Sequence, residues 1–500
     1  MDYLDPRKRR AYHIRLIIGY ILVAIVIGLG TVIIVYGANG YGINTKTGQI
    51  VENGLLFVDS KPGAAEIYLN GQDRHKTTSA RLILPAATYT LTLKRTGYRD
   101  WSRTFVLEGQ SVARYVYPFL MPQTPHLSTL KSYTSKPPII TESPDRHWLL
   151  VQSSSANGIG PVFDQYDTTT LDKTTPAVSQ IAMPAGILND YSAKSKLSVV
   201  EWSTDNNNLL LKHNYSGGTE FVVFNRTHPD QSFNVNRIFN VNPTAVNFFN
   251  KKASQLYVYD KTDGSLRLGD VKSKSLDAPI LTQVLAYKPY GSDLITYVTN
   301  KDEPSGRATA MIWDSGQSYV LDELKTSHKY LIDAAKYNGH FYYIVGSDGQ
   351  DHANIYKDPL NDIKNPAVGE AIAMLALPDK GAQIESFSDN ARFIGIESGQ
   401  HFTVYDFETG SAYRYSVKQP LADNMSWMDG NRFIGDAGGQ ILIMDFDGTN
   451  VQELTPTADT AGGLFSGDYN HLLTLAKAPG STRYLLQDMD MRAGPDLPQQ

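Results

Sequence analysis

A short apolar strand that ends in an acidic or amide residue recurs eight times from residue 163 onward in this chain of 500 residues. The copies are Phe163–Asp167, Phe221–Asn225, Leu266–Asp270, Ala310–Asp314, Asn354–Asp358, Phe402–Asp406, Leu442–Asp445 and Tyr484–Asp488. They recur on average every ~46 residues, which is the spacing of an array of similar structural units stacked on one another. This part of the chain is therefore predicted to be a β-repeat structure.

The surroundings of each copy define the repeating unit. A second apolar strand lies upstream, as at Trp148–Val151 and Phe341–Ile344, and several of these strands follow a turn such as Ser143–Arg146. A β-propeller blade has the same order: an inner strand, a turn, a second strand, a strand that ends in an acidic residue, and an outer strand. The segment resembles WD40-like and TolB-like propellers, although the Trp-Asp signature occurs only at Trp313-Asp314. Eight copies predict eight blades, with seven as the alternative.

The last copy lacks an outer strand of its own. After Asp488 the chain continues into Met491–Pro498, which is too rich in glycine and proline for a strand. We expect His126–Tyr133, at the start of the repeat region, to supply the missing strand. Such pairing would join the two ends of the ring and leave no open sheet edge.

The segment Leu16–Tyr36 is uncharged and almost wholly apolar over 21 residues. As a helix it would rise roughly 31 Å, enough to cross the hydrocarbon core of a bilayer. Cations at Arg7–Arg10 and Arg15 precede it, so the positive-inside rule places the N-terminus in the cytoplasm and the rest outside. A cleaved signal peptide is the alternative, but its apolar core would span only ~7–15 residues. The lipid bilayer is thus a predicted partner through Leu16–Tyr36, and the predicted location is the cell membrane, crossed once.

From Gly54 the pattern changes to short strands of alternating polarity, about six of them before residue 120. The segments Asp59–Gly71, Leu82–Pro85 and Tyr89–Tyr98 resemble the PEGA domain, with departures at Gly63-Ala64 and at Ala87. The resemblance implies a small, non-catalytic β-sandwich associated with the cell envelope, and it brings no catalytic residues with it.

The predicted fold class is all-β after one N-terminal transmembrane helix. The predicted organisation is a cytoplasmic basic tail at 1–15, the transmembrane helix at 16–36, a linker at 37–53, a PEGA-like β-sandwich at 54–120, a Pro-rich linker at 121–138, a β-propeller at 139–492 and a C-terminal tail at 493–500.

Composition excludes several functions. The net charge is −5 and no basic field is present, which argues against a nucleic-acid partner. The chain has no cysteine, which excludes disulfides, thiolate metal sites and a cysteine nucleophile. An exported chain without disulfides fits a bacterial envelope better than a eukaryotic cell surface.

The sequence contains no metalloprotease, nucleophile-elbow or phosphate-binding motif, so we predict no catalytic residues and no cofactor. Asp445 and Asp447 are the candidate ligands for a cation, since calcium takes clustered oxygen ligands. A glycine-containing turn at Asp447-Gly448 explains the same residues equally well.

Four aromatic residues are assigned to loops and are candidates for contacting a ligand or a partner: Tyr215, Tyr287, Tyr290 and Trp427. The predicted function is binding or scaffolding outside the cytoplasm, with a propeller presented to an envelope protein or a cell-wall glycan. The alternative is an enzyme, a hydrolase or lyase acting on envelope polysaccharide or peptide in the central funnel. Carboxylates clustered with a histidine in the funnel would favour the enzyme.

Overall fold

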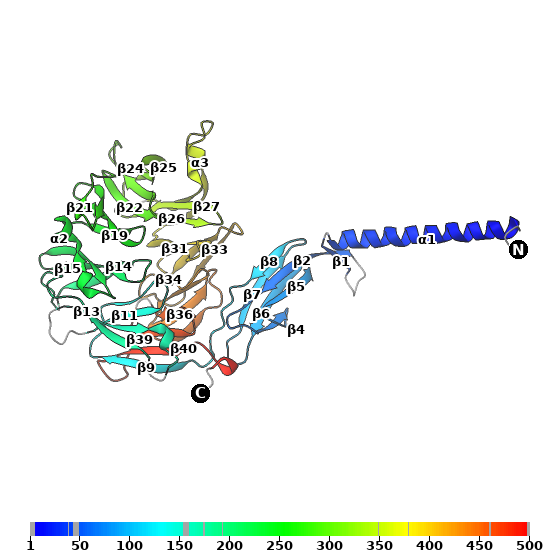
Figure 1. Cartoon of the computed structure of the whole chain (residues 1–500), viewed down its shortest axis with the longest axis horizontal. Coiled ribbons are helices and arrows are strands. Elements are labelled where there is room, and N and C mark those ends of the chain that lie inside the picture. Colours follow the sequence, from blue (N-terminus) through cyan, green and yellow to red (C-terminus); the bar gives the residue numbers. More distant parts are fainter. Residues whose placement is uncertain are drawn as a thin grey trace. The chain divides into compact units, whose positions relative to one another are not determined.

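The computed structural model describes residues 6–38, 40–43, 50–153, 160–173, 176–192, 194–348, 350–378, 380–459 and 462–497. The chain is mostly β-strand and forms two compact units (Figure 1). The first unit runs to Thr124 and also includes Arg492–Leu497, and the second contains Pro125–Met491.

The first element is the long helix α1 (Pro6–Ala38), which contains the predicted segment Leu16–Tyr36. It is longer than that segment because Pro6 is tolerated in a first helical turn and no breaker follows it before the apolar run. The apolar side chains of α1 are exposed, as at Ile21, Val26 and Ile33. Among the described residues, α1 is the one helix long and apolar enough to span a membrane.

The first unit also contains two four-stranded sheets. One contains β1 (Tyr41–Ile43), β2 (Ile50–Val58), β5 (Ala80–Pro85) and β8 (Val112–Tyr115), and the other contains β4 (Gln72–Thr77), β3 (Glu66–Leu69), β6 (Ala87–Lys94) and β7 (Trp101–Leu107). Their inner faces enclose one core that includes Leu56, Ile67, Leu91 and Trp101. Alternating burial along β6 and β7 produces this two-faced packing.

Two sequence predictions for this unit need correction. The predicted linker 37–53 contains β1 and the beginning of β2, which pair with each other. Strand β4 was not predicted because its sequence, QDRHKT, is polar throughout and lies on the sheet edge. Asn70 and Gly71 make the predicted tight turn before β4, with φ of +51° and +77°.

The second unit consists of eight four-stranded antiparallel sheets, numbered here in chain order. Sheets one to four are β10 (Ile140–Glu142), β11 (Trp148–Ser153), β12 (Val162–Asp167), β13 (Val178–Ala182); β14 (Lys196–Trp202), β15 (Asn208–Tyr215), β16 (Gly218–Asn225), β17 (Phe233–Asn234); β18 (Ala245–Phe249), β19 (Lys252–Asp260), β20 (Ser265–Asp270), β21 (Ser275–Leu276); and β22 (Val284–Tyr290), β23 (Leu294–Thr299), β24 (Arg307–Asp314), β25 (Gln317–Lys325).

Sheets five to eight are β26 (Tyr330–Tyr337), β27 (His340–Ser347), β28 (His352–Lys357), β29 (Ala373–Pro378); β30 (Ile384–Phe387), β31 (Phe393–Ser398), β32 (His401–Asp406), β33 (Ser411–Ser416); β34 (Ser426–Trp427), β35 (Arg432–Ala437), β36 (Gln440–Asp445), β37 (Gln452–Pro456); and β38 (Leu464–Phe465), β39 (His471–Lys477), β40 (Tyr484–Asp490), β9 (His126–Tyr133). Two short helices interrupt this series, α2 (Val235–Phe239) and α3 (Pro359–Ile363).

The core of the second unit lies between neighbouring sheets. Phe163 of the first sheet stacks on Phe224 of the second with ring centroids 5.3 Å apart. One apolar cluster joins the eighth sheet to the first, with Leu475 and Leu486 against Leu149. Figure 1 shows the sheets following one another around a common centre. Strands buried on both faces, such as β23 and β35, fit this stacking.

Strand β9 pairs with β40 from Tyr133↔Tyr484 to His126↔Asp490. This is the pairing expected from the missing outer strand of the last repeat. It also corrects the predicted domain limits, because β9 lies in the range 121–138 that was assigned to a linker. The repeat structure therefore begins before residue 139.

The C-terminal segment also differs from its predicted role as a tail at 493–500. Residues 492–497 pack in the first unit, where Tyr98 accepts a 2.8 Å hydrogen bond from the Ala493 backbone N–H. The breakers in this segment prevent a strand but do not prevent packing.

Candidate functional site

Two acidic residues of the repeated strands, Asp406 and Asp488, have the same structural role. Asp406 accepts from Nε and Nη2 of Arg392 at 2.9 and 2.6 Å. Asp488 lies 3.0 Å from His471 Nδ1. In both sheets the acid binds the side chain at or next to the start of the neighbouring strand, so it ties two adjacent strands together.

The turns that precede the second strand of several sheets also share one hydrogen-bond pattern. A serine Oγ accepts from the backbone N–H five residues later, at 2.9 to 3.1 Å, for Ser143, Ser203, Ser388 and Ser466. Each serine also donates to the Asp or Asn two residues further on. The repeated polar residues in these turns are thus accounted for by turn geometry.

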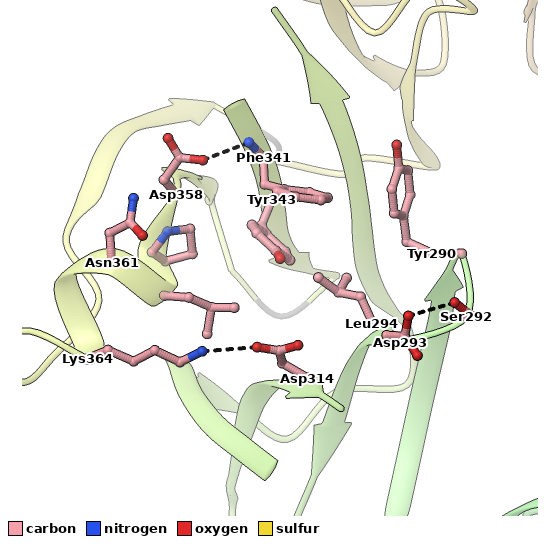
Figure 2. A pocket seen from close by; sticks show the side chains of 13 residues that line it. Tyr290, Ser292, Asp293, Leu294, Asp314, Phe341, Tyr343, Asp358, Asn361 and Lys364 are labelled. Atoms are coloured by element: carbon pink, nitrogen blue, oxygen red, sulfur yellow. Dashed lines mark hydrogen bonds and ion pairs between the residues drawn. The ribbon is translucent and has the colours of Figure 1, made fainter. Parts of the chain in front are cut away.

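A cavity of about 470 Å³ lies between the fourth and fifth sheets and is called here the aromatic groove (Figure 2). Its walls are aromatic and apolar, and its rim is polar and acidic. The lining residues are Tyr290, Gly291, Ser292, Asp293, Leu294, Asp314, Phe341, Tyr343, Asp358, Pro359, Leu360, Asn361 and Lys364.

The residues at the rim of the aromatic groove lie at strand ends and in turns. Tyr290 ends β22, and Asp293 lies in the turn to β23. Asp314 ends β24, and Asp358 follows β28. In an antiparallel meander the ends of the first and third strands meet at one edge of the sheet, so these residues of two neighbouring sheets share one face of the unit.

Asp358 is held in place by its own backbone and by β27. Its φ is +47°, in the left-handed region that aspartate tolerates better than most residues. Its Oδ1 accepts from the Phe341 N–H at 2.8 Å, and its Oδ2 lies 2.5 Å from His340 Nδ1. Figure 2 shows the rings of Phe341 and Tyr343 between the Asp358 side and the Asp293 side of the groove.

The groove is acidic, with three carboxylates and one lysine. Lys364 Nζ lies 3.0 Å from Asp314 Oδ2, and this hydrogen bond raises the pKa of Lys364. Asp293 accepts from Ser292 Oγ at 2.7 Å and is exposed. Asp293 is thus the carboxylate most accessible to a ligand.

The aromatic wall is anchored in the core. Tyr343 is 1% exposed, and burial raises the pKa of its phenol. Phe341 and Tyr290 are half-buried and pack edge to face with ring centroids 5.8 Å apart. An apolar wall beside carboxylates can bind an apolar or aromatic group that carries a hydrogen-bond donor or a positive charge.

Of the four aromatic candidates, only Tyr290 lines this groove. Tyr287 is on β22, where its hydroxyl donates to Asn247 Oδ1 at 2.8 Å and burial raises its pKa. Trp427 is on β34, donates to Ser386 Oγ at 3.1 Å and stacks 3.9 Å from Phe433. Tyr215 ends β15 and stacks 5.4 Å from His213. The assignment of these residues to loops was wrong, because all four lie in strands.

Of the candidate cation ligands, Asp445 ends β36 and Asp447 lies in the turn that follows. Asp445 Oδ2 accepts from Asn450 Nδ2 at 2.9 Å, and Asp447 Oδ1 accepts from Thr449 N–H at 3.2 Å. Gly448 has a φ of +76°, as the turn alternative expects. In the described parts of the chain, no three His, Cys, Asp or Glu side chains come together as a metal site would require.

A second polar cluster surrounds Arg146, which joins turns of four sheets. Its Nη2 donates to the Met428 carbonyl at 2.6 Å and lies 3.5 Å from Asp389 Oδ2. Its guanidinium lies 4.8 Å from the Tyr469 ring centroid, and its Nε lies 3.6 Å from Glu142. Burial raises the pKa of Glu142 to about 7. The contacts with Met428, Asp389 and Tyr469 link Arg146 to turns of other sheets, so the cluster is accounted for as a structural junction.

Residues 53–117 match the PEGA domain family. This agrees with the resemblance seen in the sequence and with the two-sheet structure of the first unit. The match covers a small part of the chain and concerns that unit alone. No curated protein sequence matches the chain.

Several solved structures show a distant likeness. An oligogalacturonate lyase in complex with manganese is 11% identical over 72% of this chain and 98% of its own, with a TM-score of 0.39. A eukaryotic initiation factor is 13% identical over 68% of this chain and 81% of its own, with a TM-score of 0.40. Hsv2 of Kluyveromyces lactis is 6% identical over 71% of this chain and 98% of its own, with a TM-score of 0.37. Scores of this size do not establish a common function.

Proposed function

We propose that this protein is a membrane-anchored binding protein whose aromatic groove holds a basic segment of a protein partner outside the cytoplasm. In this proposal α1 crosses the bilayer with its N-terminus in the cytoplasm. The uncharged run Leu16–Tyr36 and the cations before it support this orientation.

In the same proposal the second unit is an eight-bladed β-propeller. Its eight sheets, the pairing of β9 with β40 and the cluster that joins the eighth sheet to the first support a closed ring. A closed ring of blades is rigid, so its loops are held in fixed positions. Rigid placement lowers the entropy cost of binding a partner.

The composition of the aromatic groove is the reason for proposing a basic ligand. The groove has three carboxylates, Asp293, Asp314 and Asp358, and one lysine, Lys364. An acidic glycan or acidic peptide would therefore be repelled. The apolar wall of Phe341 and Tyr290 favours a side chain with a long apolar stem or a ring. In a segment that places a lysine or arginine next to an aromatic or aliphatic residue, the cation pairs with the acidic rim and the apolar residue packs against the wall.

A random peptide library displayed on phage tests this proposal with the full-length chain in detergent. We expect enrichment of peptides that place Lys or Arg beside an apolar residue. Asp293→Asn should weaken binding of an enriched peptide roughly 3–10-fold, in line with the loss of one charge pair at an interface rim. Asp302→Asn, an exposed acid outside the groove lining, is the matched control and should change nothing.

The same preparation should be offered neutral and acidic envelope oligosaccharides. Binding or turnover of an oligosaccharide, with no enrichment of basic peptides, would overturn the choice of a protein ligand. Equal loss of binding in the Asp293 and Asp302 variants would place the ligand elsewhere on the chain.

A further inference from the structure

The sheet that contains β2, β5 and β8 has an exposed apolar stripe on its outer face. Leu55 on β2 is in register with Ile83 on β5 and with Val112 on β8. Ile83 is 65% exposed and Val112 is 53% exposed, although Leu82 and Leu84 on either side of Ile83 are buried in the core. Three apolar side chains therefore lie side by side on the surface of a small unit.

Two arginines flank an aromatic ring on the next outward position of the same strands. Phe57 is in register with Arg81 on β5 and with Arg114 on β8. The guanidinium of Arg114 lies 5.5 Å from the Phe57 ring centroid. We call these six residues, Leu55, Phe57, Arg81, Ile83, Val112 and Arg114, the basic apolar face.

The outer face of the other sheet is different. Thr90 and Thr104 are hydrogen-bonded through their hydroxyls at 2.9 Å, and Thr92 and Ser102 at 3.2 Å. Val106 is the exposed apolar residue on β7. The combination of an apolar stripe with arginines thus marks one side of the first unit.

The charge of this unit also differs from that of the whole chain. Residues 50–124 carry nine Lys and Arg against six Asp and Glu, whereas the chain has 46 against 51. A basic segment next to a membrane anchor is attracted to anionic lipid.

The chain keeps this sheet close to the end of α1. Strand β1 begins at Tyr41, three residues after Ala38, and Tyr41 pairs with Glu52 on β2. Three residues span at most about 11 Å when fully extended. If α1 crosses the bilayer, as the proposed function assumes, the sheet is held at the bilayer surface.

We propose that the basic apolar face rests on the anionic lipid headgroups of the leaflet from which α1 emerges. The arginines match the charge of the lipid phosphates, and a guanidinium can bind a phosphate through two hydrogen bonds. Ile83, Val112 and Leu55 then reach the boundary between headgroups and acyl chains, where apolar side chains are stabilised.

The experiment uses the absence of cysteine in the natural chain. Full-length Val112→Cys and Thr104→Cys variants are labelled with an environment-sensitive fluorophore and reconstituted in vesicles of phosphatidylglycerol and phosphatidylcholine. A fraction of the lipids carries a nitroxide quencher on the headgroup. We expect strong quenching at position 112 and little at position 104. Equal quenching at both positions, or none at 112, would overturn the proposal.

Arg81→Gln/Arg114→Gln in the Val112→Cys background tests the role of charge. Loss of both arginines should shift the ratio of docked to undocked states roughly 30-fold toward undocked. Unchanged quenching in that variant, or in vesicles of phosphatidylcholine alone, would show that anionic lipid is not the occupant. Flotation of the same chain with vesicles reports the anchor separately, so a failure at position 112 is distinguishable from a failure of α1 to insert.

Discussion

Arg95 Nε donates a 2.8 Å hydrogen bond to Asp496 Oδ2, which joins two residues 401 positions apart in the sequence. Arg95 Nη2 also donates to the second oxygen of Asp496, and the Tyr98 hydroxyl donates to Oδ2 at 2.9 Å. The side chains of Arg95 and Asp496 are only 14% and 24% exposed. A residue near the C-terminus is therefore part of the PEGA-like unit.

Asp496→Asn should destabilise the first unit by about 2 kcal/mol, because it removes a two-point, charge-assisted pair from a partly buried site. Hydrogen exchange of peptides from β6 and β7 should then be roughly 30-fold faster. The hydrogen bonds from Arg95 lower the pKa of Asp496, so this contribution is present above the unfolded pKa and is lost as the pH falls through the folded pKa.

The exposed pair of Lys94 and Asp100 is the matched control, with side chains 46% and 50% exposed at 3.2 Å. Asp100→Asn should change stability by less than about 0.5 kcal/mol. Equal effects of the two substitutions would contradict the role given to Asp496.

Strand β9 is expected to stabilise the whole second unit. Ser128 and Ser132 of β9 are in register with Asp488 and Leu485 of β40. Ser128→Pro/Ser132→Pro should cost on the order of 5 kcal/mol and lower Tm by roughly 10 °C, because proline removes backbone donors and distorts the strand. Calorimetry should show no such change for Ser128→Ala/Ser132→Ala. A proline variant that melts like the natural chain would show that β9 does not close the ring.

The strands of the second unit could be predicted from the sequence because their signals are local or periodic. The strand-to-strand pattern from Trp148 onward and the missing partner of the last repeat were enough to assign His126–Tyr133 to the end of the series. The polar edge strand β4 and the packed segment 492–497 gave no such signal. The position of segment 492–497 depends on contacts with distant residues such as Arg95, whereas β4 pairs with the preceding strand β3 despite its polar sequence.

The aromatic groove was not predicted as a site, although part of its rim was visible. Asp314 and Asp358 were recognised as ends of repeated strands, and repeated strand ends share one face of such a unit. The step that sequence could not supply is the packing of the fourth sheet on the fifth, which brings Phe341 and Tyr343 beside Tyr290. Tyr287 and Trp427 were misassigned because nearby Pro289, Gly291 and Gly430 favour turns, whereas pairing with the next strand extends the sheet.

Lys364 is expected to compete with a basic ligand for Asp314, since the two are 3.0 Å apart at the rim of the groove. Lys364→Gln should therefore strengthen binding of an enriched basic peptide roughly threefold, and Asp314→Asn should weaken it by a similar factor. Fluorescence anisotropy at low and high salt would measure both effects. Weaker binding in Lys364→Gln would indicate an anionic ligand.

Glu397 makes the stability of the second unit depend on pH. It is 3% exposed, and burial raises its pKa to about 7 despite a 3.0 Å hydrogen bond from the Met425 N–H. The folded state therefore takes up a proton more readily than the unfolded state between pH 4.5 and about 7, so the free energy of unfolding falls as the pH rises through this window.

Glu397→Gln should be more stable than the natural chain at pH 8, by up to roughly 3 kcal/mol, with no difference at pH 4.5. Urea unfolding at the two pH values measures this. A variant that is less stable at pH 8 would show that the carboxylate is stabilised by its surroundings.

The central claim is that α1 is a membrane anchor that leaves both β units outside the cytoplasm. Because the chain has no cysteine, single cysteines can be placed at Asp2 and at the exposed Asp302 and treated with a membrane-impermeant maleimide. We predict that position 302 is labelled in intact cells and position 2 only after lysis. Labelling of position 302 only after lysis would contradict the account.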